Sequence, residues 1–435
     1  MPNTLTHRRV LQVAVPIVIS NATVPILGAV DTGVVGQLGA AAPIGAVGIG
    51  AIILTSIYWV FGFLRMGTAG LAAQAAGAKE NEEVAAILSR SLLVGFFAGV
   101  LIILCQVPLL WGAFQLSPAS VEVETLAREY VAIRVWSAPA TIAIYGITGW
   151  LIALERSKSV LVVQVAMNGL NIILDLVFVL GLDMGVAGVA WATFLAEWIG
   201  LAIGLWLCRD TFAGDGWKDK TRVLAAASLK RMAGVSSDIL IRSVLLQAIF
   251  VSFLFWGADF GDVQLAANQV LLQFLSITAF ALDGFAFAAE ALVGQALGAK
   301  RRAELRRAAV LTSIWGAGVC AVFAVAFAVF GPWAIDLMAK DPAVQAAGRV
   351  YLPYMVAAPI LGVAAWMLDG IFIGATRTAD MRNMMIVSTV IYVLSVLPLM
   401  AVFGNHGLWL GMLISFLARG ITLGLRYPAL EKQAG

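Results

Sequence analysis

The sequence predicts an all-α polytopic membrane protein with twelve transmembrane helices in two six-helix parallel repeats. Only 12% of its 435 residues are charged and 61% are hydrophobic, whereas a soluble domain carries about 25% charged residues. The apolar residues form segments long enough to cross a bilayer, and the second half of the chain repeats motifs of the first. The net charge of +3 is too small to indicate nucleic-acid binding.

Apolar segments fill most of the chain. A crossing takes about 20 helical residues, and twelve segments reach that length, roughly at 10–37, 45–72, 87–112, 129–153, 160–181, 186–207, 232–257, 264–293, 306–331, 348–374, 384–403 and 407–426. The first is too long for a signal-peptide core, so we interpret it as an uncleaved span. The polar stretch 208–231 predicts a cytoplasmic linker between lobes 1–207 and 232–435.

The basic residues predict the orientation. With the N-terminus inside, 22 of the 28 Lys and Arg fall at the termini and even-numbered loops, counted with the adjoining span ends. Odd-numbered loops hold three, Arg128, Lys340 and Arg349. The positive-inside rule therefore places both termini in the cytoplasm of a multi-pass inner-membrane protein.

An internal repeat supports the division into halves. GTAGLAAQAAGAKE at 67–80 matches AAEALVGQALGAKR at 288–301 with an offset of 221. The same offset relates residues in other spans, pairing Tyr130 with Tyr351, Gly149 with Gly370 and Arg156 with Arg377. Six spans per repeat return the chain to the same side, so the halves are predicted to be parallel repeats.

An acid in the first span is the principal candidate for function. Asp31 lies in an apolar segment six residues after Pro25, where the helix ladder is interrupted. A carboxylate in a span costs a few kcal/mol and usually has a task. We therefore expect Asp31 to act in ion uptake and Pro25 to act as a hinge.

Polar residues of two further spans are expected beside Asp31. In the fifth span Asn168, Asn171 and Asp175 follow i, i+3, i+7 and form one stripe, and Thr193 lies at a similar depth in the sixth. When two carboxyl groups share one pocket, at least one of them tends to keep its proton. Such a group could take up a proton from one side of the membrane and release it to the other. Na⁺ at Asp31 and Asp175 stays open because oxygen atoms suit hard cations. A polar cluster that only joins helices is the alternative.

The second half carries other charged residues. Asp283 and Glu290 are seven residues apart on one helix face, and Asp369 and Arg242 lie in two further spans. We expect these four residues, together with Asn168 of the fifth span, to shape a cavity or contact substrate. Asp238 and Arg242, at i, i+4, are expected to form an ion pair. The separated Cys and His residues predict no metal site and no cofactor besides the coupling ion.

Six stretches in order across the chain resemble the multidrug and toxic compound extrusion (MATE) transporters, in particular their DinF-like branch. They are VDTGVVGQLG at 30–39, FLRMGTAGLAAQAAGAK at 63–79, NIILDLVFVLG at 171–181, DILIRSVLLQ at 238–247, ALDGFAFAAEALVGQALGAK at 281–300 and LDGIFIGATRTADMRN at 368–383. The resemblance implies a V-shaped bundle and export of small organic, often cationic, compounds coupled to inward H⁺ or Na⁺. It also implies that Asp31 is the coupling acid, within a network of Asn171, Asp175 and Thr193.

Two alternatives to such an exporter stay open. A flippase for lipid-linked precursors of the same superfamily would need several mid-span basic residues, and the candidates are Arg65, Arg134 and Arg242. An intramembrane aspartyl protease would need a GxGD context, which the sequence lacks. The sequence also lacks a nucleotide-binding loop of the GxxxxGK[ST] type, so ATP is not expected to be the energy source. We therefore expect a transporter rather than an enzyme. We also expect it to be a monomer that is surrounded by membrane lipids.

Overall fold

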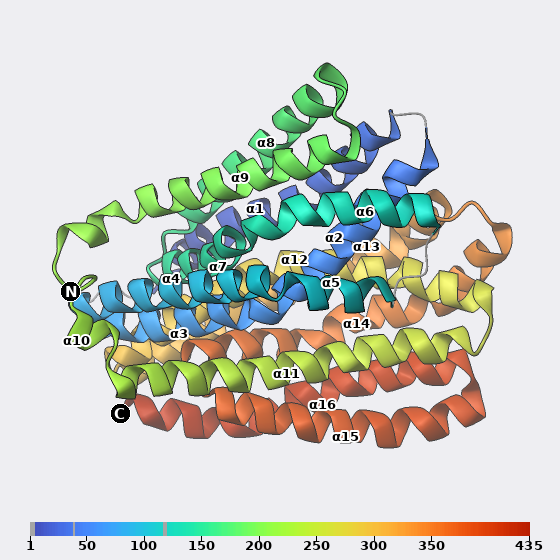
Figure 1. Cartoon of the computed structure of the whole chain (residues 1–435). Helices are drawn as coiled ribbons and strands as arrows, with labels where there is room; N and C mark the ends of the chain where they lie inside the picture. The colour runs from blue at the N-terminus through green and yellow to red at the C-terminus, as the bar shows by residue number, and fades with distance from the viewer. Residues whose placement is uncertain (1–4, 38–39, 116–119) are drawn as a thin grey trace. The chain divides into compact units, whose positions relative to one another are not determined.

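The computed structural model describes residues 5–37, 40–115 and 120–435, and the regular structure over these ranges is helical throughout (Figure 1). Within the described residues, twelve helical segments are long and apolar enough to cross a membrane, which confirms the predicted number. The helices extend beyond several predicted apolar segments because polar residues at the ends of the spans continue the backbone hydrogen-bond ladder.

Six spans make up the first half. They are α1 (His7–Gly36), α2 (Ala41–Trp59) continued by α3 (Phe63–Gly77), α4 (Asn81–Leu104), α6 (Val121–Arg134) continued by α7 (Ala138–Ala153), α8 (Ser157–Asp175) and α9 (Gly185–Leu207). A short helix, α5 (Gln106–Gln115), follows α4. Single 3-10 turns join α2 to α3 and α6 to α7, so each pair crosses as one span.

The second half has longer, less interrupted helices. They are α11 (Ala226–Ala258), α12 (Asp262–Gly298), α13 (Arg302–Met338), α14 (Pro342–Gly374), α15 (Thr378–Phe403) and α16 (Asn405–Glu431). The core between them combines aliphatic and aromatic side chains, with the Phe253 and Trp409 rings 4.6 Å apart between α11 and α16.

The helices of the two halves pair in the same pattern. Packed pairs α4–α7, α8–α9 and α2–α6 in the first half correspond to α13–α14, α15–α16 and α12–α14 in the second. These are the pairs that an offset of 221 residues predicts. The repeat therefore extends from sequence to helix packing.

The helix ends repeat as well. Lys79 and Lys300 have positive φ values of 63° and 54°, and Glu155 and Thr376 have values of 58° and 50°. Both pairs are 221 residues apart. The backbone amide that follows each of these four residues donates to the carbonyl oxygen five residues before it, at 2.8–3.0 Å. All four helices therefore end in the same left-handed turn.

Two glycines related by the repeat allow close helix contact. A Cβ on Gly149 of α7 would lie 2.2 Å from the backbone oxygen of Arg65, and a Cβ on Gly370 of α14 would lie 2.4 Å from that of Ala286. Backbone atoms cannot rotate away as the end of a side chain can. Both positions therefore require glycine because of the approach of two helices.

We expect Gly370→Ala to lower the free energy of unfolding by about 1–3 kcal/mol, because one methyl group forces α14 away from α12. Gly318→Ala in α13 is the matched control, since nothing lies within 4 Å of its added Cβ. There, alanine should stabilise the helix by about 0.5–1 kcal/mol. Thermal unfolding of both variants in detergent would show this, and equal midpoints would contradict the close-contact argument.

The chain packs as two compact units. One contains Ile19–Ala76 and Glu80–Ala233, and the other contains the residues up to Val18, Gly77–Lys79 and Gly234–Gly435. The part of α1 up to Val18 thus belongs with the second-half helices, where Gly284 of α12 contacts Ala14 and Val18. The remainder of α1 belongs with the first half. The lobe boundaries at 207 and 232 stay a prediction.

The polar segment 208–231 packs on its own unit. It contains α10 (Lys220–Val223), whose first turn is capped by Asp219. The hydrogen bond from the Thr221 hydroxyl to Asp219 holds the pKa of that carboxyl below its usual value. Arg222 pairs with Glu82 of α4 at 2.6 Å. The predicted linker is therefore attached to the start of α4.

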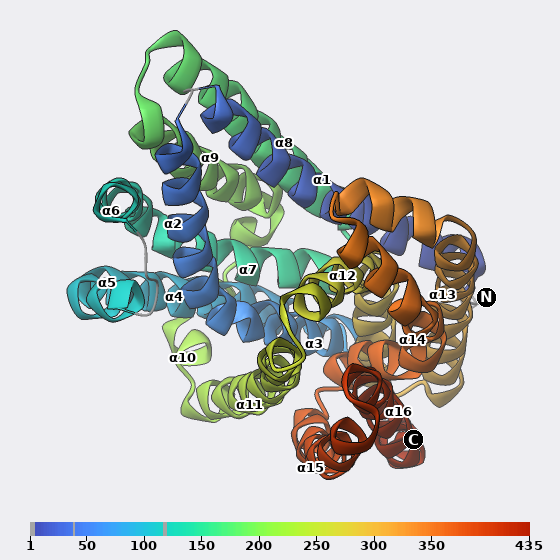
Figure 2. The same ribbon diagram turned by 90° about the vertical axis from the view of Figure 1, so that its right-hand side faces the viewer.

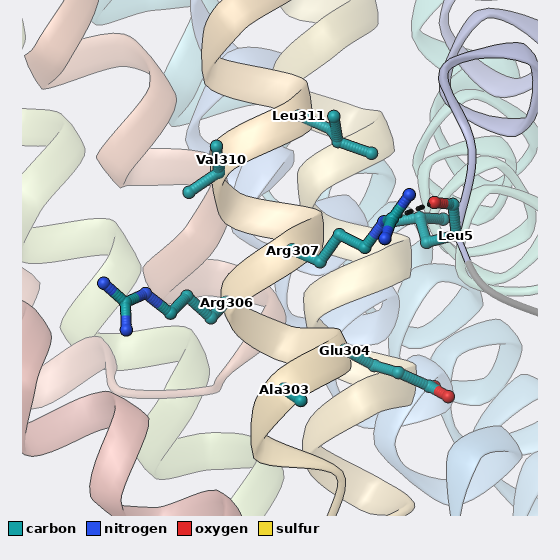
Figure 3. Close-up of a pocket in the computed structure, with 7 residues that line it drawn as sticks. All are labelled: Leu5, Ala303, Glu304, Arg306, Arg307, Val310 and Leu311. Atoms are coloured by element: carbon teal, nitrogen blue, oxygen red, sulfur yellow. Dashed lines mark hydrogen bonds between the residues drawn. The ribbon is translucent and has the colours of Figure 1, made fainter.

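Leu5 and Glu431, near the two ends of the chain, lie beside the start of α13. Arg307 donates to the backbone oxygen of Leu5 at 2.6 Å, and Arg302 pairs with Glu431 of α16 at 3.1 Å. In Figure 3 Arg307 points toward Leu5, whereas Arg306 points away from it, and both residues line a surface pocket. The two ends of the chain consequently lie at the same end of this unit.

Candidate functional site

Asp31 lies in the part of α1 that packs with the first-half unit. Its side chain is half-buried, and its carboxyl group is within hydrogen-bonding reach of the Asp175 carboxyl of α8. α1 and α8 run side by side in Figure 2. Within the described part of the chain, the Oδ1 atoms of both residues are buried without a hydrogen-bond partner. The two acids thus form a close pair.

Asn171 and Thr193 hold one side of this pair. Asn171 Nδ2 donates to Asp175 Oδ2 at 3.3 Å and lies 3.3 Å from Thr193 Oγ1. Asn171 and Asp175 are fully buried, and Thr193 is half-buried on α9. The structure therefore brings together Asp31, Asn171, Asp175 and Thr193, while their role in coupling stays a prediction.

Asn168 contacts a different part of α1. Its Nδ2 donates to Thr23 Oγ1 at 2.7 Å, and its Oδ1 accepts from Gln164 at 3.1 Å. The bond to Thr23 joins α8 to α1 about two turns before Asp31. The position fits a helix contact that aligns the two acids better than a substrate contact.

The end of α8 has an unexpected backbone. After Asp175 the helix widens into a π-helical segment, Leu176–Gly181, and Leu182 N bonds Val177 O at 2.9 Å. π-Helical turns are rare and are frequent at functional sites. Nothing in the apolar sequence of this segment indicated the change in winding.

A buried ion pair adjoins the two acids. Arg134 at the end of α6 donates to Glu197 of α9 at 2.7 Å and to the Tyr130 hydroxyl at 2.9 Å. Arg134 also interacts electrostatically with Asp31 and Asp175. The sequence identified Arg134 only as a mid-span cation, and Glu197 was not among the predicted site residues. Its signal was present, because an acid four residues after Thr193 lies on the same face of the span.

The charges of this cluster do not balance. Asp31, Asp175 and Glu197 supply three carboxyl groups, and the single guanidinium group of Arg134 interacts with all three. An arginine does not give up its proton in a protein. Protons or a small cation must therefore offset part of the negative charge when the cluster is buried.

The predicted residues of the second half form separate groups. Asp369 of α14 accepts from Arg242 of α11 and, at 2.7 Å, from Arg419 of α16. Glu290 is buried and Asp283 half-buried on α12. Whether these residues contact substrate stays a prediction.

The expected pairing of Asp238 with Arg242 is wrong. Asp238 instead accepts from Arg382 at 2.5 Å and from Thr378 at 3.0 Å, both on α15. Arg242 turns to Asp369. Partners on neighbouring helices replace the i, i+4 contact because that contact is worth only about 0.2–0.5 kcal/mol.

Two further predictions concern Pro25 and metals. α1 continues as one helix through Pro25, and its role as a hinge stays a prediction. Across the ranges that the structure describes, no three His, Cys, Asp or Glu side chains are grouped to hold a metal. Oxygens of Asp31, Asp175, Asn171 and Thr193 are the atoms that a hard cation such as Na⁺ could use.

The family model MatE matches residues 16–177 and 239–399. DNA damage-inducible protein F of Escherichia coli (strain K12) is 37% identical over 427 residues, with 97% of this chain and 92% of that protein covered. A probable multidrug resistance protein NorM of Pseudomonas syringae pv. tomato is 24% identical, covering 95% of this chain and 93% of NorM.

Solved structures agree in fold. A mutant of the MATE transporter VcmN of Vibrio cholerae superposes with a TM-score of 0.85 at 18% identity, covering 97% of this chain and 96% of that one. The matched family model and the 37% identity confirm the resemblance found in the sequence. The chain belongs to the MATE family and is a multi-pass membrane transporter of small molecules, not an enzyme.

Proposed function

We propose that the protein exports organic, chiefly cationic, compounds in exchange for protons that flow inward, with Asp31 as the coupling carboxylate. The observation that carries this proposal is the Asp31–Asp175 pair beside Arg134. The relative named as a probable multidrug resistance protein supports export of drug-like compounds.

The charge of the cluster supplies the coupling. A protonated Asp31 can donate a hydrogen bond from its O–H to Asp175, whereas two ionised carboxylates within hydrogen-bonding reach of each other repel. When both are ionised, the negative charge attracts a cation, either H⁺ or an organic compound. Proton and compound then lower each other's affinity reciprocally, which is the thermodynamic requirement for antiport.

Asn171 and Thr193 hold Asp175 in position for this exchange. Their hydrogen bonds keep one Asp175 oxygen occupied, so the other stays available to Asp31. Pro25 lets α1 respond to the charge change, since the missing backbone donor weakens the helix six residues before Asp31. Na⁺ is the alternative coupling ion at the same oxygens.

We place the protein in the inner membrane as a monomer surrounded by lipid, with both termini in the cytoplasm. The asymmetry of Lys and Arg between the loops supports this orientation. Both chain ends lying beside the start of α13 agrees with an even number of spans. Asp31 then lies in the outer half of the membrane, where an acidic exterior can protonate it.

Purified protein in vesicles tests the proposal. An imposed pH gradient should drive movement of a fluorescent organic cation, and a protonophore should abolish it. Gradient-driven transport that needs sodium instead of protons would replace H⁺ by Na⁺ as the coupling ion. Transport of the dye that neither gradient accelerates would contradict secondary active export.

A further inference from the structure

We propose that the second-half unit binds a singly charged anion at the Arg242–Asp369–Arg419 triad, the anion being a halide or the carboxylate of an organic compound. Arg242 of α11 and Arg419 of α16 both donate to the same oxygen, Oδ2, of Asp369 on α14. The residues are 7%, 3% and 8% exposed in the order Arg242, Arg419, Asp369. Two guanidinium groups thus share one carboxylate inside a transmembrane bundle.

The triad itself carries an excess of positive charge, because two guanidinium groups share one carboxylate. Among the described residues, Asp238 is the next acid along α11, and it already pairs with Arg382 at 2.5 Å. The Asp238–Arg382 pair is neutral and leaves the net charge of the triad unchanged. Arginine keeps its proton even when buried, so the group cannot become neutral by deprotonation as a lysine could. A buried net charge of this kind calls for a counter-ion.

A second observation points to a ligand. The Nε atom of Arg242 is buried and has no hydrogen-bond partner among the described residues. A buried donor without an acceptor is costly, and a guanidinium can use a second edge to hold another anion. The unpaired Nε–H of Arg242 is the donor that such an anion would accept.

The surroundings favour an anion with an apolar body. Trp366 and Phe416 lie three residues before Asp369 and Arg419, one helical turn away on the same faces, and their rings are 5.6 Å apart. An aromatic pair next to paired arginines suits an aromatic carboxylate, while a halide needs the charge alone. The chemistry shared by both is a single negative charge that accepts N–H bonds.

The triad has no counterpart in the first-half repeat. Subtracting 221 from 242, 369 and 419 gives Asn21, Thr148 and Trp198, which carry no charge. The backbone contacts repeat between the halves, but the charges do not. The residues of the anion site therefore belong to the second-half unit alone.

Binding of radiolabelled chloride and radiolabelled benzoate to the purified, detergent-solubilised protein tests the proposal. In a buffer that contains no halide and no other carboxylate, at least one of the two should bind and raise the thermal midpoint. Arg242→Gln leaves one arginine for one carboxylate and should weaken that binding by about tenfold or more. Asp369→Asn leaves two arginines without an acid and should strengthen it.

Arg349→Gln is the control, because its partner Asp336 is on an exposed face of the same unit. It should leave anion binding unchanged. Chloride binding alone would assign a halide site, and benzoate binding alone would assign an organic carboxylate site. The proposal fails if neither anion binds the wild type, or if Arg242→Gln and Asp369→Asn change binding no more than Arg349→Gln does. The measurement needs no transport, so its failure is distinct from failure of proton coupling at Asp31.

Discussion

Asp31→Asn should reduce proton-driven movement of an organic cation in vesicles to the level of protein-free vesicles. Asparagine keeps the size and one hydrogen-bonding oxygen of the side chain but cannot take up or release a proton. With Asp31 neutral, Asp175 loses its charged neighbour and the cluster keeps only one of its two exchangeable sites. Binding of the dye without a gradient should persist at reduced affinity, since Asp175 and Glu197 remain.

Asp336→Asn is the matched control for this substitution. Asp336 is a partly exposed acid on α13 that pairs with Arg349 at 2.5 Å, far along the chain from the candidate site. It should transport at the wild-type rate. Wild-type, gradient-driven transport by Asp31→Asn would contradict the coupling role, and equal loss in both variants would indicate damage to folding instead.

Asn171→Ala should give an intermediate result in the same vesicles. The change removes the hydrogen bond to Asp175 Oδ2, typically worth about 0.5–1.5 kcal/mol. Because both carboxyl groups remain, we expect the pH dependence of transport to shift while the maximal rate changes little. This graded order, from Asp31 to Asn171, separates an exchangeable site from a side chain that positions it.

Much of the arrangement could be predicted from the sequence because two physical signals are strong in membranes. The length of apolar runs determined the twelve spans, and the cost of burying a charge identified Asp31 and Asp175. The i, i+3, i+7 spacing then predicted that Asn171 and Asp175 share a face. The number of residues from the outer end of each span predicted that Thr193 lies at the same depth as these two residues. In the structure Thr193 Oγ1 lies 3.3 Å from Asn171 Nδ2.

Pairing between distant helices could not be predicted in the same way. Arg134 and Glu197 are 63 residues apart, and no period in the sequence connects them. Arg419 was counted with the basic residues at the membrane surface, although it is buried against Asp369. Periodicity assigns a residue to a face, but only the packing of helices decides which charge that face meets.

Arg134→Met should lower the free energy of unfolding by about 3–5 kcal/mol, the usual cost of leaving a buried charge without its partner. Glu197, at 11% side-chain exposure, would lose its ion pair, and Asp31 and Asp175 would lose the cation that interacts with them. Glu197→Gln should cost less, because Arg134 would still face those two carboxyl groups. The double variant Arg134→Met/Glu197→Gln should recover part of the loss, giving a coupling energy of about 0.5–3 kcal/mol.

The neighbouring pair on α6 provides the comparison. Arg128 and Glu124 form an exposed i, i+4 ion pair at 2.7 Å, and Arg128→Met should change the stability by less than about 1 kcal/mol. Denaturant unfolding of the four variants in one detergent would measure the difference. A cost for Arg134→Met no larger than that for Arg128→Met would mean that water or protons already compensate Glu197. In that case Arg134 would not offset the negative charge of the site. The inference that one guanidinium group faces three charged carboxyl groups would then be wrong.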